Sequence, residues 1–276
     1  MVKFRKIVFI ALASVCMLGG AVSCSVKELR DECPVWVTVL FDQFIKIGQT
    51  DGIVSFSGAE LIDRPELNFL SYIGKGYVQE MPRDYARVAV LSGVENERFS
   101  ESSMYVPYGK QAGLVWAYAH TFAKNQDEYL VDAEPHKQYC KVKFMFDESP
   151  TAPTDYMWRF RIKAECNGMN VYTLEPLEGD YCCPVGPNAV GEWYGIIPRQ
   201  KSNNMMLEIY VPDGEGSDGG RLDYVIDLGK RFEEKGYDWS EEDLKDIQVK
   251  VGFVAATIVI DVEPWVDDTT YRDVDI

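Results

Sequence analysis

The stretch CKVKFMF, residues 140 to 146, alternates between apolar positions on one face and Lys141 and Lys143 on the other. A second stretch, RFRIKAEC at residues 159 to 166, repeats this alternation with four charged side chains on its polar face. The apolar positions of the two stretches are Cys140, Val142, Phe144, Phe146, Phe160, Ile162, Ala164 and Cys166. Alternation of this kind is typical of antiparallel strands whose sheet is covered on one face. The two stretches therefore predict the core of an all-β sandwich.

The connection between these stretches, ESPTAPTD at residues 148 to 155, is rich in turn-forming residues. If the two strands form a hairpin centred on Pro153, Phe146 lies opposite Phe160 and Cys140 lies opposite Cys166. Opposed residues in an antiparallel pair have Cα atoms about 4.5 to 5.5 Å apart, which a disulfide can span. The hairpin register thus predicts either a Cys140–Cys166 disulfide or two buried free thiols.

Five further stretches have the composition of strands, and none belongs to a repeated strand-helix-strand pattern. They are VWVTVLF (35–41), YARVAVLS (85–92), MLEIYV (206–211), IQVKVGF (247–253) and TIVIDV (257–262). Two short helices are expected between strands, one over Asp227 to Lys235 and one beginning at Ser240. The polar stretch AEPHKQ, residues 133 to 138, marks a boundary. We therefore expect two tandem antiparallel β-sandwich domains, 35–136 and 137–276, with short helical insertions.

The N-terminus has the layout of a secretory signal, with three basic residues followed by an uncharged apolar run from Ile7 to Val22. This run of 16 residues is short for a membrane-spanning helix, which leaves an uncleaved anchor as the weaker alternative. The residues Ala21-Val22-Ser23 stand directly before Cys24 and resemble the lipobox of bacterial lipoproteins. The sequence therefore predicts a lipoprotein signal peptide at 1–23, a lipid on Cys24 and a spacer up to residue 34.

The charge balance excludes some partners and favours others. Removal of residues 1 to 23 takes away three basic and no acidic side chains, so the formal net charge changes from −16 to −19. Nucleic acid is therefore an unexpected partner, because phosphate binding needs a basic patch. Anionic lipid is disfavoured for the same reason, so the membrane contact is expected through the lipid on Cys24.

No stretch of the sequence has the residues of a catalytic or metal site. No cysteine pair has the C-x-x-C spacing of a zinc site, and His120 and His136 do not complete a zinc motif with any cysteine. The glycine-rich DGEGSDGG, residues 213 to 220, lacks both the following helix of a dinucleotide loop and the ligands of a calcium loop. We interpret it as a hairpin tip. The sequence thus predicts no enzyme activity, no metal and no cofactor.

The stretch SVKELRDECPVWVTVLF, residues 25 to 41, resembles the opening of the FimB-like fimbrial anchor lipoproteins of Bacteroidales, with Asp31-Glu32-Cys33-Pro34 as the step into the first strand. KVKFMF (141–146), LDYVIDLGKRFEEKGYDWSEEDLKDIQVKVGF (222–253) and the closing TIVIDVEPW (257–265) are similar to later parts of the same family. The resemblance implies two transthyretin-like sandwiches.

The resemblance also implies a function. It indicates a non-catalytic lipoprotein of the outer membrane that anchors or caps a fimbrial polymer, at the cell surface or at the base of the fimbria. A fimbrial subunit would be its partner, bound by addition of a strand to an exposed sheet edge. The alternative is a surface glycan-binding lipoprotein of a polysaccharide-utilisation system, which would need exposed Trp and Tyr side chains. An exported hydrolase is a third interpretation, and nothing in the sequence favours it.

Overall fold

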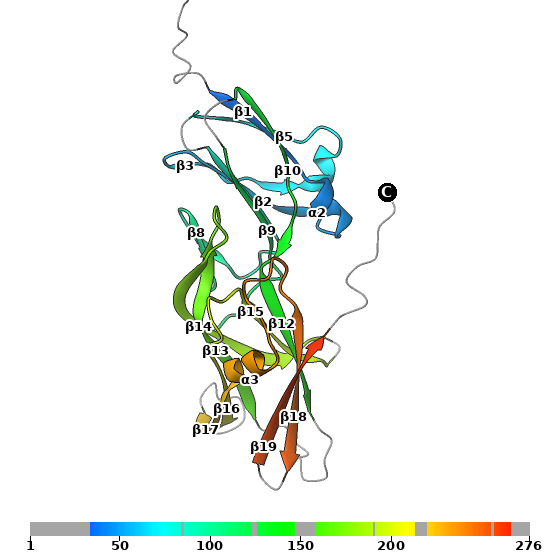
Figure 1. The fold of residues 1–276 in the computed structure, drawn as a ribbon, viewed down its shortest axis with the longest axis vertical. Coiled ribbons are helices and arrows are strands. Elements are labelled where there is room, and N and C mark those ends of the chain that lie inside the picture. The colour runs from blue at the N-terminus through cyan, green and yellow to red at the C-terminus, as the bar shows by residue number, and fades with distance from the viewer. Residues whose placement is uncertain are drawn as a thin grey trace, which may run out of the picture. The chain divides into compact units, whose positions relative to one another are not determined.

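The computed structural model shows a chain built mainly of strands, as the alternating patterns predict (Figure 1). The backbone is described for residues 34–83, 86–122, 126–146, 158–189, 191–212, 220–254 and 257–265, and the side chains up to residue 252 except Pro212. The predicted signal peptide, Cys24, Cys33 and the glycine-rich stretch before residue 220 lie outside the described residues. No helix in the described ranges is long and apolar enough to span a membrane.

The first described strand, β1 (Val35–Leu40), is the centre of a three-stranded sheet. It pairs antiparallel with β5 (Tyr77–Met81) and parallel with β10 (Glu128–Asp132). Val35, Val37 and Val39 are buried, which confirms the predicted apolar face of this strand. Because β1 begins at residue 35, the predicted spacer ends where the sheet starts.

A second sheet follows the order β11-β9-β6-β2-β3, with β4 also paired to β2. Its strands are β2 (Asp51–Ser57), β3 (Leu61–Asp63), β4 (Glu66–Asn68), β6 (Arg87–Ser92), β9 (Trp116–Thr121) and β11 (His136–Lys137). Two helices that the sequence patterns did not predict lie in this half of the chain, α2 (Asp42–Lys46) and the 3-10 helix η2 (Phe69–Tyr72). Each contributes a fully buried phenylalanine, Phe44 and Phe69, to the core.

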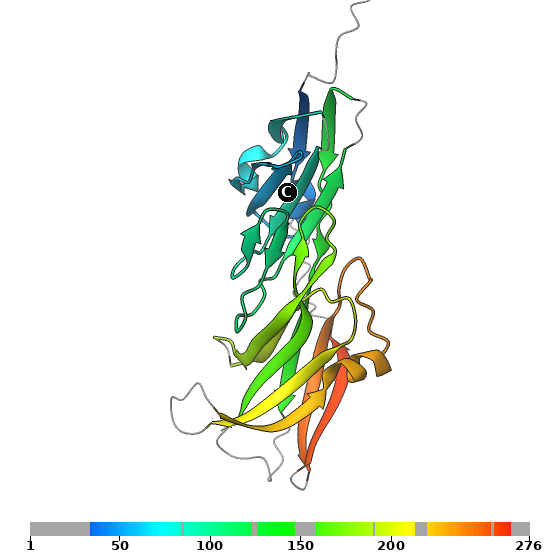
Figure 2. The same cartoon turned by 90° about the vertical axis from the view of Figure 1, so that its left-hand side faces the viewer.

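The remaining strands form a larger sheet in the order β17-β16-β13-β14-β15-β12-β18-β19. They are β12 (Tyr139–Phe146), β13 (Arg159–Asn170), β14 (Pro176–Pro187), β15 (Trp193–Pro198), β16 (Met205–Pro212), β17 (Gly220–Asp227), β18 (Asp246–Val254) and β19 (Thr257–Trp265). In Figure 2 the strands β16 and β17 run obliquely to β18 and β19. The sheet thus folds over itself and encloses the second part of the core.

The predicted hairpin between β12 and β13 is wrong. β12 pairs with β15 and β18, whereas β13 pairs with β14, β16 and β8 (Ser103–Tyr105). The predicted meeting of Phe146 and Phe160 does occur, with ring centroids 5.2 Å apart. The two rings meet across the core, between stacked layers of strands. An apolar strand face can pack against a facing layer as well as beside the apolar side chains of a neighbouring strand.

The expected antiparallel pairing does not hold for every strand. Among the described strands, β1 runs parallel to β10 and β12 runs parallel to β18. Both parallel pairs join strands that are far apart in the sequence, which leaves the long connection that parallel pairing requires.

The helix α3 (Leu228–Glu234) confirms the first predicted helical insertion. The Asp227 side chain accepts a hydrogen bond from the Lys230 backbone N–H at 2.8 Å, and Gly236 adopts a positive φ of 70° just after the helix. The second predicted helix, beginning at Ser240, is wrong. In its place the chain forms turns whose carbonyl groups accept hydrogen bonds from the guanidinium group of Arg199.

The two predicted domains share strand pairing in the described region. β7 (Arg98–Ser100) pairs with β8, and β8 pairs with β13 of the second half. At this crossing a Cβ atom on Gly168 would lie 2.1 Å from the Met104 carbonyl oxygen, so only glycine allows the approach. Residues 34 to 276 form one unit by their contacts, and the division near residue 136 stays a prediction.

Candidate docking surfaces

The free edges of the sheets are the first candidate surface, because unpaired backbone groups at an edge can bind an added strand. The edge strands β3 and β11 have only three and two residues. In contrast, β17 has eight residues and β19 has nine, and no described strand pairs with their outer edges. Proteins commonly protect edges by keeping them short, and these two edges are longer than β5 and β10, the five-residue edges of the three-stranded sheet.

Strand β17, labelled in Figure 1, pairs irregularly with β16 and has two exposed apolar side chains. The register with β16 shifts between Ile209 and Tyr210, which leaves Asp223 as an extra residue without a paired position. Leu222 and Val225 are exposed on either side of this bulge. A bulge twists an edge and interrupts its pairing, so it decides which backbone groups an added strand can reach.

A charged and aromatic network supports this edge from the neighbouring strand β16. The Glu208 carboxylate accepts a hydrogen bond from Tyr210 Oη at 2.6 Å and lies 2.9 Å from Lys163 Nζ. Burial alone would raise the pKa of Glu208, but these two hydrogen bonds and the positive charges of Lys163 and Arg161 lower it below its usual value. Glu208 is therefore ionised in the folded protein, and the network holds β16 against β13.

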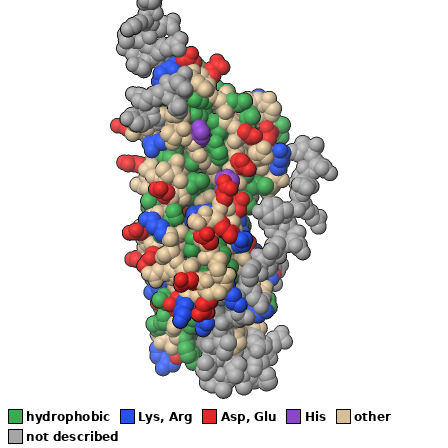
Figure 3. All heavy atoms as spheres, in the orientation of Figure 1, with side chains coloured by type: hydrophobic (Ala, Val, Ile, Leu, Met, Phe, Trp, Pro, Cys, Tyr) green, Lys and Arg blue, Asp and Glu red, His purple; other side chains and the backbone are tan. Residues whose placement is uncertain are grey.

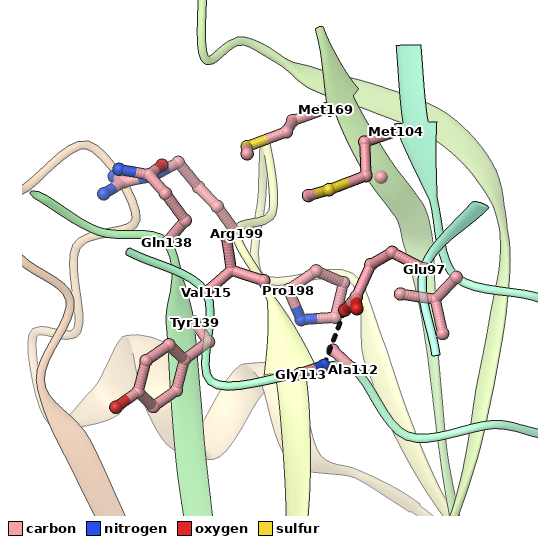
Figure 4. Close-up of a pocket in the computed structure, with 12 residues that line it drawn as sticks. Glu97, Met104, Ala112, Gly113, Val115, Gln138, Tyr139, Met169, Pro198 and Arg199 are labelled. Atoms are coloured by element: carbon pink, nitrogen blue, oxygen red, sulfur yellow. Dashed lines mark hydrogen bonds between the residues drawn. The ribbon is translucent and has the colours of Figure 1, made fainter. Parts of the chain in front are cut away.

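The enclosed pocket in Figure 4 is small. Its volume is about 20 Å³, enough for one water molecule. Met104 and Met169 line one part of it, and the Glu97 carboxylate accepts a hydrogen bond from the Gly113 backbone N–H at 2.5 Å (Figure 4). Small-molecule sites usually have about 300 to 1,000 Å³, so this pocket does not fit an organic ligand.

A wider hollow of about 420 Å³ opens between the turn after β13, the segment after β15 and the loop after α3. Trp239 lines it, but this side chain is buried and its indole N–H donates a hydrogen bond to Asn203 Oδ1 at 2.8 Å. A sugar-binding platform needs the face of an aromatic ring open to solvent. Among the tryptophans with described side chains, only Trp36 is strongly exposed, and it lies elsewhere, on β1.

The molecular surface carries mostly acidic charge. Figure 3 shows acidic side chains over the visible face, gathered most closely beside a histidine near its middle. His136 lies beside two acidic side chains, with Nε2 3.2 Å from a Glu242 oxygen and Nδ1 3.8 Å from an Asp243 oxygen. Within the described residues, no group of three His, Cys, Asp or Glu side chains is placed to hold a metal ion.

The structure separates the two cysteines that the hairpin register had brought together. Cys140 is paired in register with Ile197 and Cys166 with Glu178, and both side chains are buried free thiols. Cys140 belongs to the main hydrophobic core, whereas Cys166 does not. The predicted disulfide was based on a strand pairing that does not exist, so of the two alternatives the structure has the free thiols.

Cys182 and Cys183, both on β14, are also buried free thiols, and Cys183 belongs to the main hydrophobic core. Burial raises the pKa of Cys183 to about 12 and that of Cys140 to about 12. Neutral thiols in these positions behave as small apolar side chains rather than as nucleophiles.

The resemblance predicts that a partner adds a strand to an exposed sheet edge, but it does not identify the edge strand. The exposed apolar residues Leu222 and Val225 flank a charged residue, which is a weak sequence signal for an edge strand. The free edge itself depends on which strands become neighbours, and local sequence does not contain that information.

Comparison with known proteins gives no match to any protein-family model and no match to the sequence of any curated protein. Solved structures do match. The fimbrial anchor protein Mfa2 from Porphyromonas gingivalis aligns with 84% of this chain and 98% of its own, at a TM-score of 0.54 and 10% identity. A candidate adhesin from Bacteroides ovatus aligns with 86% of this chain and 97% of its own, at a TM-score of 0.55 and 10% identity.

A third structure, described as a candidate polysaccharide-binding protein from Bacteroides thetaiotaomicron, aligns with 86% of this chain and 99% of its own. Its TM-score is 0.53 and its identity 11%. At this level of identity the likeness establishes a shared fold over most of the chain. The all-β fold that the resemblance implied is therefore confirmed.

Proposed function

We propose that this protein is a non-catalytic lipoprotein that anchors or caps a fimbrial polymer at the bacterial surface. The observation that carries the proposal is the likeness of fold to the fimbrial anchor Mfa2 over 84% of this chain and 98% of that one. The Cys24 context adds a means of attachment to the outer membrane, because lipid on this residue would tether the chain.

The geometry of the spacer suits an anchor. Ten residues lie between Cys24 and the first residue of β1, Val35. A chain of this length reaches at most about 35 Å even when fully extended. The first strand of the folded part would therefore lie close to the membrane.

The partner in this proposal is a fimbrial subunit that adds a strand to the open edge of β17. Backbone hydrogen bonds to the edge would supply binding energy, and contacts with the exposed Leu222 and Val225 side chains would select side chains of the added strand. β19 is the other long edge in the described chain, and Pro264 removes one hydrogen-bond donor from it. This favours β17.

The glycan-binding alternative has one observation in its favour, the fold shared with a candidate polysaccharide-binding protein. The strongly exposed aromatic rings among the described side chains are Trp36 on β1, Tyr105 on β8 and Tyr108 in the loop after β8, and Trp36 belongs to a different sheet from β8, so the three do not form one row. Retention of the purified protein on a polysaccharide column would support it, and passage of the protein through such a column would count against it.

The Asp223→Pro variant tests strand addition at β17. Proline removes one backbone N–H and fits a bulge, where Asp223 has no paired position on β16. The matched control is Asp223→Ala, which keeps the N–H and removes only the side chain that lies 3.4 Å from Arg221. Both variants should keep the wild-type circular dichroism spectrum.

The measurement is binding of each purified variant to fimbrial subunits purified from the source organism. We expect Asp223→Pro to weaken binding about tenfold or more and Asp223→Ala to bind as the wild type does. Equal binding by the proline variant would refute addition at this edge. If the wild-type protein does not bind the subunits at all, the proposed anchoring function is wrong.

A further inference from the structure

The outer face of the three-stranded sheet carries apolar side chains that nothing in the described chain covers. Trp36 is 46% exposed, Val78 51% and Leu130 71%. They come from the three different strands β1, β5 and β10. The opposite face of the same sheet is packed into the core, so this face is the only one that a partner could reach.

The strand register places these side chains next to one another. Thr38 of β1 is paired with Val78 of β5 on one side and with Leu130 of β10 on the other. Residues that are directly paired point to the same face of a sheet, and Trp36 is two positions before Thr38 on that face. The four side chains therefore form one contiguous patch, which we call the outer sheet patch.

A continuous apolar patch on a sheet face differs from scattered exposed residues. Single apolar side chains are common on protein surfaces, but a contiguous patch with a polar rim usually marks a site of interaction. Tryptophan is enriched at the energetic centre of protein interfaces, so Trp36 is the side chain of the patch expected to contribute most to binding.

The rim of the outer sheet patch is acidic. Trp36 lies between its paired neighbours Glu80 and Glu128, and Asp132 is at the far end of β10. The three strands contain no lysine or arginine. Among the described residues neither Glu80 nor Glu128 takes part in a salt bridge, so both carboxylates are available to a basic partner.

This charge pattern selects one kind of occupant. A second copy of the chain would place carboxylates against carboxylates, and close contact of like charges costs several kcal/mol. An anionic lipid surface is disfavoured by the same repulsion. A protein surface with lysine or arginine around apolar side chains would complement both the rim and the centre of the patch.

We propose that the outer sheet patch is a docking site for a partner protein whose contact surface is apolar at its centre and basic at its rim. The site is separate from the β17 edge and does not depend on strand addition or on the lipid. It gives the protein a second contact, on a sheet face rather than on a sheet edge.

The test uses the full-length lipoprotein extracted in detergent, with a benzophenone photocrosslinker attached at a Leu130→Cys substitution. The probe is the envelope protein extract of the source organism, and mass spectrometry identifies the crosslinked peptides. The control carries the same label at Met145→Cys, an exposed apolar position on β12 outside the patch. A second protein adds the Glu80→Lys and Glu128→Lys substitutions to the labelled Leu130→Cys chain.

We expect a crosslink to a lysine- or arginine-rich surface of another protein, absent from the Met145→Cys control and reduced about tenfold or more by the two charge reversals. Raising the salt concentration should reduce it as well. The proposal is overturned by crosslinks only to the same chain, to lipid or to glycan, by no crosslink, or by a crosslink that survives charge reversal in a variant with wild-type circular dichroism. The Asp223→Pro substitution should leave this crosslink unchanged.

Discussion

The Arg199→Met substitution should destabilise the protein strongly, because this side chain ties a loop to the start of β12. The guanidinium donates hydrogen bonds to five oxygen atoms. The acceptors are the carbonyl groups of Lys137 (3.1 Å), Trp239 (2.6 Å), Glu241 (2.6 Å) and Glu242 (2.8 Å), and Gln138 Oε1 (2.8 Å). No methionine atom can replace any of these donors.

The magnitude follows from which acceptors water can reach after the substitution. Glu241 and Glu242 belong to the exposed part of the loop, so water can replace the lost donor there. Gln138 and Trp239 are buried, and each loses about 1.5 to 2 kcal/mol when its acceptor is left unpaired, whereas the Lys137 carbonyl keeps the hydrogen bond from the Leu244 backbone N–H at 3.4 Å. The expected loss is therefore about 3 to 4 kcal/mol.

Thermal unfolding followed by circular dichroism measures this loss. For a chain of this size about 1 kcal/mol corresponds to about 2 to 4 °C, so Tm should fall by about 10 °C. The control is Lys201→Met, which removes an exposed ion pair to Glu178 and should change stability by less than about 1 kcal/mol. A Tm for Arg199→Met within about 2 °C of the wild type would refute the reasoning.

Three further predictions concern the helix, the thiols and acid stability. Gly229→Ala should lower the unfolding free energy measured in urea, although alanine favours helices, because its Cβ would lie 1.4 Å from the Asn203 carbonyl oxygen; an unchanged midpoint would contradict this. Cys140 and Cys183, with pKa values raised to about 12, should react with a thiol reagent at pH 8 only after denaturation, and rapid labelling of either in the native protein would show that it is not buried. The folded pKa of Glu208 is below 4.5, so its stabilisation is complete above that pH and is lost as pH falls through the folded value. Glu208→Gln should therefore flatten the loss of Tm below pH 4.5, and an unchanged acid profile would exclude this contribution.

The strands and their buried faces could be predicted from the sequence because alternation is a local property. Val35, Val37 and Val39 are buried as expected, and so are Phe160 and Ile162. The end of α3 was also predictable, since Gly236 supplies the positive φ that stops a helix there.

The neighbours of each strand could not be predicted in the same way. Alternation shows which face of a strand is apolar, but many strands share that pattern and can satisfy it. Phe146 and Phe160 do meet, as the hairpin required, but they do so across the core. The true partners of Val142 are Gly195 and Ile247, which come much later in the sequence.

The helix expected at Ser240 does not form, because hydrogen bonds to the Arg199 side chain outweigh the helix-capping pattern in the sequence. Ser240 does not cap a helix; its N–H and its hydroxyl both donate hydrogen bonds to the Asp238 carboxylate, which closes a local turn. The following carbonyl groups bind Arg199 instead of helical N–H groups, which requires turns. The outer sheet patch was missed for a similar reason, since Trp36, Val78 and Leu130 become neighbours only when three distant strands pair.

The most direct test of the account is the location of fimbriae in cells that carry the Cys24→Ala variant. The control is Cys33→Ala, which removes a nearby cysteine that is not expected to carry lipid. Fimbriae are quantified by immunoblot in the cell fraction and in the culture medium. The account predicts fimbriae released into the medium for Cys24→Ala and retained on cells for the wild type and Cys33→Ala. Cells of the Cys24→Ala variant that retain their fimbriae as the wild type does would contradict it.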